Sequence, residues 1–315
     1  MSKVRHDPST LRSDMKEERK SRRGVNGLRV KFELPSDVAT AGGAAADPHP
    51  NFKYHGGPVV LDPQVFAIYL GDWVSASNQA RASRLNQYLT DLVGSTYMNI
   101  LSQYGCGTAG RFVGSAFVAN TDHNLSERDI HRLLQKAIDA KVIPEPVNHN
   151  NAYVVFLDDL TGVKDRGLGV VMCEARSDNA FGYHNLFTTA ANNPCNYAII
   201  PGLSDTCLQE TCGGSANCSL HTSETQEQRQ TQVASHEFAE MISNPMGNAW
   251  FDGSSGDENG DLCNGIQGTI TVGGRTWTVQ RMYSKADDLA SAGGNICVLP
   301  PAQPIAPLVP NVARL

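Results

Sequence analysis

The residues with the clearest chemical potential lie in the stretch from Gln232 to Cys263. It contains His236-Glu237-Phe238-Ala239-Glu240, an H-E-x-x-E pattern, in a segment whose apolar spacing predicts a helix. We expect the helix to begin at Thr231 or Gln232 and to end at Asn244-Pro245, because the residue before proline avoids helical geometry. Helical residues four apart are neighbours, so His236 and Glu240 can bind one cation from a single face.

Glu237 is rotated by one residue from this face and can act on a water molecule as a general base without binding the ion. Two ligands and a base on one helix resemble the metal-binding helix of zincin peptidases, in which the second ligand is usually histidine. Glutamate-rich amphipathic helices also match the pattern by chance. The glycine-rich loop that follows offers further carboxylates, which favours a three-ligand metal site; they are Asp252, Asp257, Glu258 and Asp261.

Composition narrows the class of protein. The chain has 315 residues, a formal net charge of −6 and 40% hydrophobic residues, which is typical of a globular protein with one large or two modest domains. No apolar run approaches the roughly 20 residues that span a membrane. The mild acidity gives no reason to expect a nucleic-acid partner. The oligomeric state has no signal in the sequence.

The cysteines predict disulfides. There are eight, and four of them cluster in a loop rich in glycine, serine and asparagine: Cys195, Cys207, Cys212 and Cys218. We expect bridges within this cluster and a bridge from Cys263 to Cys297 or a nearby partner, and hence an oxidising compartment. Two alternatives are a zinc site formed by Cys207, Cys212, Cys218 and His221, whose spacing matches no common zinc template, and reduced core cysteines.

The chain divides into three parts. Residues 1–50 form a charged arm and linker, with one short strand expected at Leu28–Leu34 and no apolar core of a secretory signal. Residues 51–299 form the domain, and residues 300–315 form a proline-rich extended tail. Strands are expected at Val65–Leu70, Arg111–Ala119, Ala152–Leu157, Leu168–Glu174 and Tyr197–Pro201, helices at Ala76–Val93, Tyr97–Tyr104 and Asp129–Ala140, and a Gly-Gly hairpin at Thr269–Arg281. This order predicts an α/β fold: a zincin-like single domain with a mixed sheet, an active-site helix and a loop-rich, disulfide-stapled C-terminal part.

Two motifs together resemble the EXORDIUM, or phosphate-induced protein, family of plant cell-wall proteins and their microbial relatives. The first is Tyr54-His55-Gly56-Gly57-Pro58-Val59-Val60; the second combines the H-E-x-x-E helix and Asn244-Pro245 with Asn248-Ala249-Trp250-Phe251 and Glu258-Asn259-Gly260-Asp261-Leu262-Cys263. The resemblance spans about Tyr54 to Cys297. It implies a secreted wall protein whose activity is not settled. Asp252 stands where the plant pattern often has a small residue, and the charged N-terminus replaces the apolar signal of plant members.

The resemblance narrows the third metal ligand to Glu258 or Asp261, since both lie in the matching E-x-G-D segment, with His184 of a Tyr-His segment as an outside candidate. The longer side chain of Glu258 can reach back over the helix more easily, so we expect it to bind and Asp261 to orient a ligand. His55 is expected to hold a turn.

Zn²⁺ accepts this set of histidine and carboxylate ligands. Ca²⁺ is a lesser hypothesis for the oxygen-rich loop Asp252–Asp261. The leading interpretation is a secreted zinc metallohydrolase that cleaves a peptide or protein substrate. The alternative is a non-catalytic cell-wall or signalling protein with a structural metal.

Overall fold

The computed structural model describes residues 47–165, 170–173, 180–212, 220, 223–291, 294–309 and 312–313, without the side chains of residues 211 and 212. The predicted arm before residue 47, with its strand at Leu28–Leu34, lies outside these residues. So do Cys218 and His221, and residues 168, 169 and 174 of the strand predicted at Leu168–Glu174, within which β7 (Val170–Val171) is described.

The fold is a mixed α/β structure built on a five-stranded sheet with the order β3-β2-β5-β9-β8. Four strands run parallel: β2 (Gln64–Leu70), β3 (Arg111–Val118), β5 (Asn151–Leu157) and β9 (Pro194–Ile200). At the edge, β8 (Tyr183–Thr188) pairs antiparallel with β9. The mixed sheet is therefore confirmed, but β8 was not predicted from the sequence.

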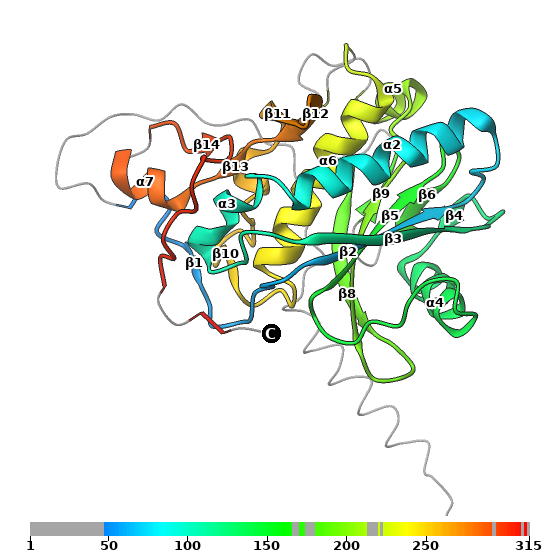
Figure 1. The fold of residues 1–315 in the computed structure, drawn as a ribbon, viewed down its shortest axis with the longest axis horizontal. Coiled ribbons are helices and arrows are strands. Elements are labelled where there is room, and N and C mark those ends of the chain that lie inside the picture. Colours follow the sequence, from blue (N-terminus) through cyan, green and yellow to red (C-terminus); the bar gives the residue numbers. More distant parts are fainter. Residues whose placement is uncertain are drawn as a thin grey trace, which may run out of the picture.

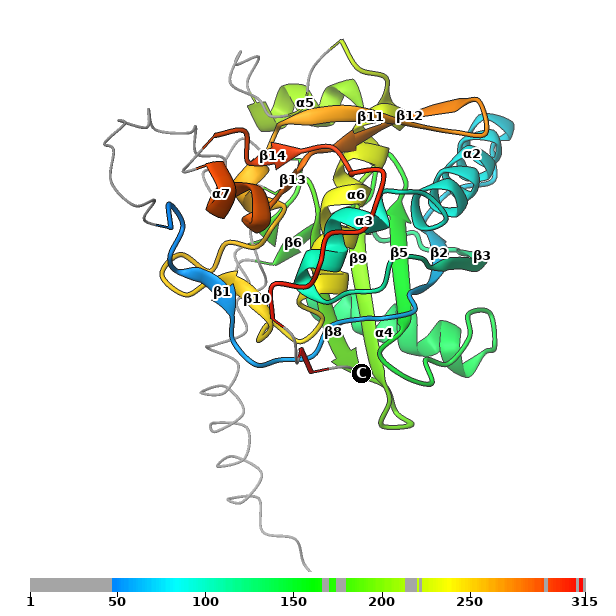
Figure 2. The same cartoon turned by 60° about the vertical axis from the view of Figure 1, so that its left-hand side comes forward.

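Helices cover both faces of this sheet. Helices α2 (Ala76–Val93) and α6 (Gln226–Ser243) lie on one face, and α4 (Glu127–Asp139) lies on the other (Figures 1 and 2). Alternate residues of a strand point to opposite faces. In β5, Val154 and Phe156 join the core under α2 and α6, whereas Val155 and Leu157 join the core over α4. The short strands β4 (Asn124–Leu125), β6 (Gly162–Asp165) and β7 extend the second core.

The C-terminal half adds small elements around α6. They are α5 (Asp205–Cys212), β10 (Trp250–Asp252), the 3-10 turn η2 (Asp261–Cys263), β11 (Gln267–Val272), β12 (Arg275–Gln280), β13 (Met282–Tyr283), α7 (Lys285–Ser291) and β14 (Cys297–Val298). Earlier in the chain come β1 (Phe52–Tyr54), α3 (Met98–Leu101) and the 3-10 turn η1 (Ser102–Tyr104). The predicted hairpin is confirmed as β11–β12, whose turn residues Gly273 and Gly274 have φ of 54° and 79°. Among the described residues, no helix is long and apolar enough to cross a membrane.

Helix α6 begins earlier than predicted. A capping box starts it, in which the Thr225 side chain accepts from the Gln228 amide and the Gln228 side chain accepts from the Thr225 amide. The start expected at Thr231 or Gln232 is therefore wrong. The extra turn carries polar residues that are nevertheless buried, such as Gln230, which donates to the Pro201 carbonyl at 3.2 Å. Apolar periodicity cannot detect such a turn. The end at Ser243, before Pro245, agrees with the prediction.

Two segments far apart in the sequence pair beside the C-terminal end of α6. Strands β1 and β10 are antiparallel, with Tyr54 opposite Trp250, and β1 lies next to β10 in Figure 2. The amide of Gly57 donates to the Asn248 carbonyl at 2.8 Å. The His55 ring stacks on Phe251 with centroids 3.8 Å apart, which agrees with its expected structural role.

One of the two described disulfides agrees with the prediction and the other differs from it. Cys263–Cys297 is confirmed. Cys207, however, bonds to Cys173, which lies outside the predicted cluster, and this bond rules Cys207 out as a zinc ligand. Cys195 is a free thiol that β9 buries in the core over α4. Burial also raises the pKa of Cys195, which keeps the thiol protonated.

We expect the Cys263–Cys297 bond to stabilise the C-terminal part. Replacing both residues by alanine should lower the free energy of unfolding by about 2–4 kcal/mol, because the unfolded chain regains the freedom of the closed loop. Urea unfolding without reductant measures this loss. The matched control is Cys195→Ala, which removes a buried thiol but no cross-link and should cost less. Equal losses in the two variants would contradict the prediction.

Candidate metal centre

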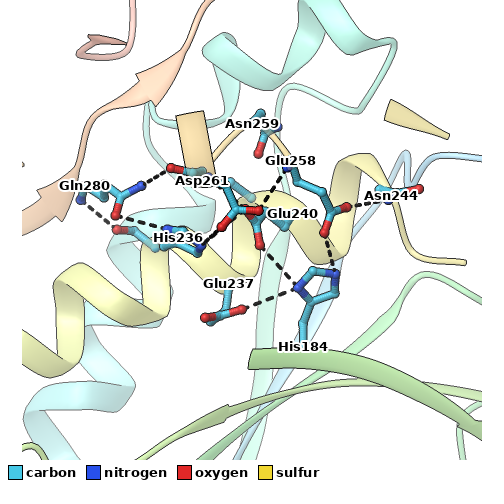
Figure 3. Close-up of polar contacts among 12 residues, drawn as sticks. His184, His236, Glu237, Glu240, Asn244, Glu258, Asn259, Asp261 and Gln280 are labelled. Atoms are coloured by element: carbon cyan, nitrogen blue, oxygen red, sulfur yellow. Dashed lines mark hydrogen bonds and ion pairs between the residues drawn. The ribbon is translucent and has the colours of Figure 1, made fainter. Parts of the chain in front are cut away.

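Six ionisable side chains meet between α6, the edge strand β8 and the loop that ends in η2. Helix α6 contributes His236, Glu237 and Glu240; His184 projects from β8, and Glu258 and Asp261 approach from the loop (Figure 3). Every one of these side chains is at most 9% exposed. Neighbouring residues of β8 point to opposite faces, so Tyr183 enters the core over α4 while His184 faces α6.

One group of three ligand atoms gathers around His236. Its Nε2 lies 3.2 Å from Glu240 Oε1 and 3.7 Å from Asp261 Oδ1. Ligand atoms of a tetrahedral zinc ion with bonds of about 2.0–2.1 Å are themselves roughly 3.4 Å apart. The three residues therefore have a spacing that suits a shared cation.

A second group gathers around His184 and shares Glu240 with the first. His184 Nδ1 lies 3.4 Å from Glu237 Oε2 and 3.4 Å from Glu240 Oε2. The other ring nitrogen, Nε2, lies 3.2 Å from Glu258 Oε2. Residues His184, Glu237 and Glu240 thus form another set that could hold a metal ion.

The tautomer of His236 follows from its neighbour Gln280 on β12. The side-chain amide of Gln280 donates to the Gly260 carbonyl at 2.7 Å, so its oxygen faces His236 Nδ1 at 3.0 Å. That oxygen can only accept, which places the proton on Nδ1 and leaves Nε2 of the neutral ring bare. A bare Nε2 directed at two carboxylates is the state that a metal-binding histidine requires.

Two glycines let the backbone approach the charged groups closely. A Cβ added at Gly260 would lie 2.7 Å from Glu240 Oε1 and 2.9 Å from His236 Nδ1. At Gly182 it would lie 2.7 Å from Glu237 Oε1. Because Gly260 has no side chain, the following amide of Asp261 can donate to Glu240 Oε1 at 3.1 Å.

Several atoms of the cluster are buried without a hydrogen-bond partner. They are His236 Nε2, Glu237 Oε1, Glu258 Oε2 and Asp261 Oδ1. Buried polar atoms are almost always paired in proteins, so the two that converge, His236 Nε2 and Asp261 Oδ1, call for a ligand. Imidazole nitrogen and carboxylate oxygen are the donors that Zn²⁺ and related cations accept, and the residues fit such an ion.

Burial and mutual charge act against each other on the pKa values. Burial lowers the pKa of both imidazoles, but the carboxylates around them outweigh it, raising the pKa of His184 well above its usual range and that of His236 to about 10. Burial also raises the pKa of Glu237, of Asp261 and of Glu258, the last to about 7. At Glu240 the two imidazoles prevail over burial and lower the pKa to about 2.

All the predicted site residues lie in one cluster, but their neighbours differ in part from those expected. Asp261 stands next to His236, whereas Glu258 faces His184 and accepts a hydrogen bond from Asn244. His184 is part of the cluster itself. Sequence reasoning did not assign a role in the site to Asn244 or Gln280. The Asn-Pro pair at the end of the helix was a sequence signal that could have indicated Asn244. No sequence signal indicated Gln280, because this residue lies on a hairpin 44 residues beyond His236.

The carboxylate of Asp252, considered for Ca²⁺, is used inside its own turn. Its Oδ1 accepts from the Ser254 amide at 2.7 Å and from the Ser255 amide at 3.1 Å. Among the described residues, the groups that could hold a metal contain neither Asp252 nor Asp257. A Ca²⁺ ion in this loop stays a prediction.

The chain is similar to one plant protein of the family that its motifs resemble. Protein EXORDIUM-like 5 from Arabidopsis thaliana is 24% identical over 266 residues, which cover 73% of this chain and 69% of the plant protein. No protein-family model matches the chain. The similarity supports a relationship to the EXORDIUM family and carries no information about catalysis.

The geometry predicts unequal effects for the two loop carboxylates. Asp261→Ala should weaken the binding of one Zn²⁺ ion far more than Glu258→Ala, because Asp261 Oδ1 lies beside His236 Nε2 and Glu258 does not. We expect a loss of roughly 10–100-fold for Glu258, which acts through His184. Zinc titration with a competing chelator measures both affinities. The reverse order would restore the assignment expected from the sequence.

Metal affinity should rise with pH. A cation must displace the proton from His236, whose pKa is about 10, and from the Glu258 and Asp261 carboxyls, whose pKa values are raised. These groups hold protons in the metal-free protein below their pKa, so competition from protons weakens as the pH rises from about 7 to about 10, the pKa values of Glu258 and His236. Calorimetry in buffers of different ionisation enthalpy counts the released protons. Binding without proton release would contradict the prediction.

Proposed function

We propose that the protein is a zinc-dependent hydrolase of peptide bonds, with His236, Glu240 and Asp261 as metal ligands and Glu237 as general base. The observation that carries this proposal is the convergence of His236 Nε2, a buried nitrogen without a hydrogen-bond partner, with Glu240 Oε1 and Asp261 Oδ1. A divalent cation in such a site supplies Lewis-acid activation of water or of a carbonyl group.

The residues of the chain have separate tasks in this proposal. Gln280 holds the His236 ring in the binding tautomer. Glu237 has one oxygen 3.4 Å from His184 and the other, Oε1, unpaired. Oε1 would take a proton from the attacking water and return it to the leaving amine. Burial raises the pKa of Glu237, which strengthens it as a proton acceptor.

A second candidate function is a non-catalytic extracellular protein that uses the ion for structure. The observation in its favour is burial, since no side chain of the cluster is more than 9% exposed. A cation there would link the helix to the loop carrying Asp261, as structural sites do.

We also propose that the chain is an EXORDIUM-family protein that works outside the cell. The similarity to the Arabidopsis protein supports the family. The disulfides Cys173–Cys207 and Cys263–Cys297 support the location, because such bonds persist in oxidising compartments.

The Glu237→Gln variant separates the two functions. Loaded with one equivalent of Zn²⁺, it should keep the ion and lose about 10²–10⁴-fold in hydrolysis of a peptide library, because an amide cannot accept the proton. His236→Ala, as the matched ligand variant, should lose both metal and activity. Hydrolysis is followed by mass spectrometry, and metal by elemental analysis. A wild type loaded with one equivalent of Zn²⁺ that is as inert as Glu237→Gln would favour the structural role instead.

A further inference from the structure

The carboxylate of Glu240 lies between two imidazoles and presents a different oxygen to each. Oε1 is 3.2 Å from His236 Nε2, and Oε2 is 3.4 Å from His184 Nδ1. Only one of these oxygens is needed for the cation site of the proposed function. A carboxylate with both oxygens directed at separate ligand sets is suited to bridge two cations, as acidic residues do in two-metal centres.

The second ligand set has the spacing of a binding site by itself. From His184 Nδ1, both Glu237 Oε2 and Glu240 Oε2 lie at 3.4 Å. Ligand atoms around a tetrahedral ion with bonds of about 2.0–2.1 Å are spaced by roughly 3.4 Å. The other ring nitrogen of His184, Nε2, faces the Glu258 carboxylate. Glu258 can therefore orient the His184 ring, as Gln280 orients the His236 ring through its Nδ1.

Charge also points to a second cation. The cluster contains four buried carboxylates, those of Glu237, Glu240, Glu258 and Asp261, and two imidazoles that are neutral when they bind metal. When all four carboxyls are ionised, one divalent cation leaves two negative charges uncompensated in the interior, which is unfavourable. Two divalent cations balance the four carboxylates.

The buried carboxylate of Glu237 belongs to the second ligand set. Glu237 is 1% exposed, and its Oε1 has no hydrogen-bond partner. The carboxylate lies in the ligand set of His184 and not in that of His236. A second cation beside His184 would contact the Glu237 carboxylate, whose Oε2 lies 3.4 Å from His184 Nδ1.

We propose that the centre holds two divalent cations bridged by Glu240, the second of them bound by His184, Glu237 and Glu240 with Glu258 behind the histidine. This inference rests on the first cation site of the proposed function and adds a neighbouring one. In the two-ion form Glu237 is a ligand and not a base. Hydrolysis therefore belongs to the one-ion form, and the second ion switches it off.

The test is the zinc stoichiometry of the full-length protein. Protein stripped with a chelator and dialysed is titrated with zinc sulfate alone, and bound metal is measured by calorimetry and elemental analysis. We expect two ions per chain in the wild type and one in His184→Ala. His123→Ala is the matched control, because this exposed histidine belongs to neither ligand set, and the variant should bind two ions.

A second measurement on the unmodified protein guards against a misfolded His184 variant. Anomalous diffraction at the zinc edge from zinc-loaded crystals should show two peaks, one on either side of Glu240. Two ions in His184→Ala, or one ion and one peak in the wild type, would overturn the second site and leave the proposed function standing. No bound ion in the wild type would overturn both.

Discussion

Four carboxylates and two imidazoles share one buried volume, and their charges have to be balanced there. Burial opposes charge on every one of them, yet Glu240 keeps a pKa of about 2 because two imidazoles flank it. The unpaired atoms that remain, His236 Nε2 and Asp261 Oδ1 among them, show that the side chains do not satisfy one another. The surrounding structure therefore has to hold mutually repelling groups close together.

Three kinds of restraint achieve this. Helix α6 fixes the spacing of His236 and Glu240 through its own geometry, and the capping box at Thr225 anchors its start. The antiparallel edge strand β8 brings His184 up from the sheet. Two features hold the loop. The disulfide to Cys297 starts at Cys263, the last residue of η2, and glycine at position 260 lets the backbone contact the side chains of the helix.

The two motifs that resemble the EXORDIUM family have different physical tasks. The Tyr54–Val60 motif pairs with the segment Asn248–Phe251, through β1, β10 and the bonds of Gly57 and His55. It is structural, and it lies outside the charged cluster. The H-E-x-x-E helix and the Glu258–Cys263 segment supply the ionisable groups. The first motif therefore supports the loop that the second needs, since β10 leads directly into that loop.

The sequence by itself determined the local elements and most of the chemistry. Helical spacing placed His236 and Glu240 on one face, the proline at 245 ended the helix, and the Gly-Gly pair set the hairpin turn. These are short-range effects, which a few neighbouring residues decide. The sequence did not predict the start of α6, because the first turn of this helix is polar yet buried. It did not predict β8 either, because the residues of this strand show no clear alternation of apolar and polar side chains.

Only the tertiary structure decided which groups face each other. His184 meets Glu240 because β8 pairs with β9 beneath α6, and Gln280 reaches His236 from a hairpin 44 residues away. The order of Glu258 and Asp261 depended on the turn at η2, which directs Asp261 toward His236 and Glu258 toward His184. The pairing of Cys207 with Cys173 likewise joins segments that are distant in the sequence. Such contacts depend on how strands and helices pack, and the spacing of residues along the chain does not predict this packing.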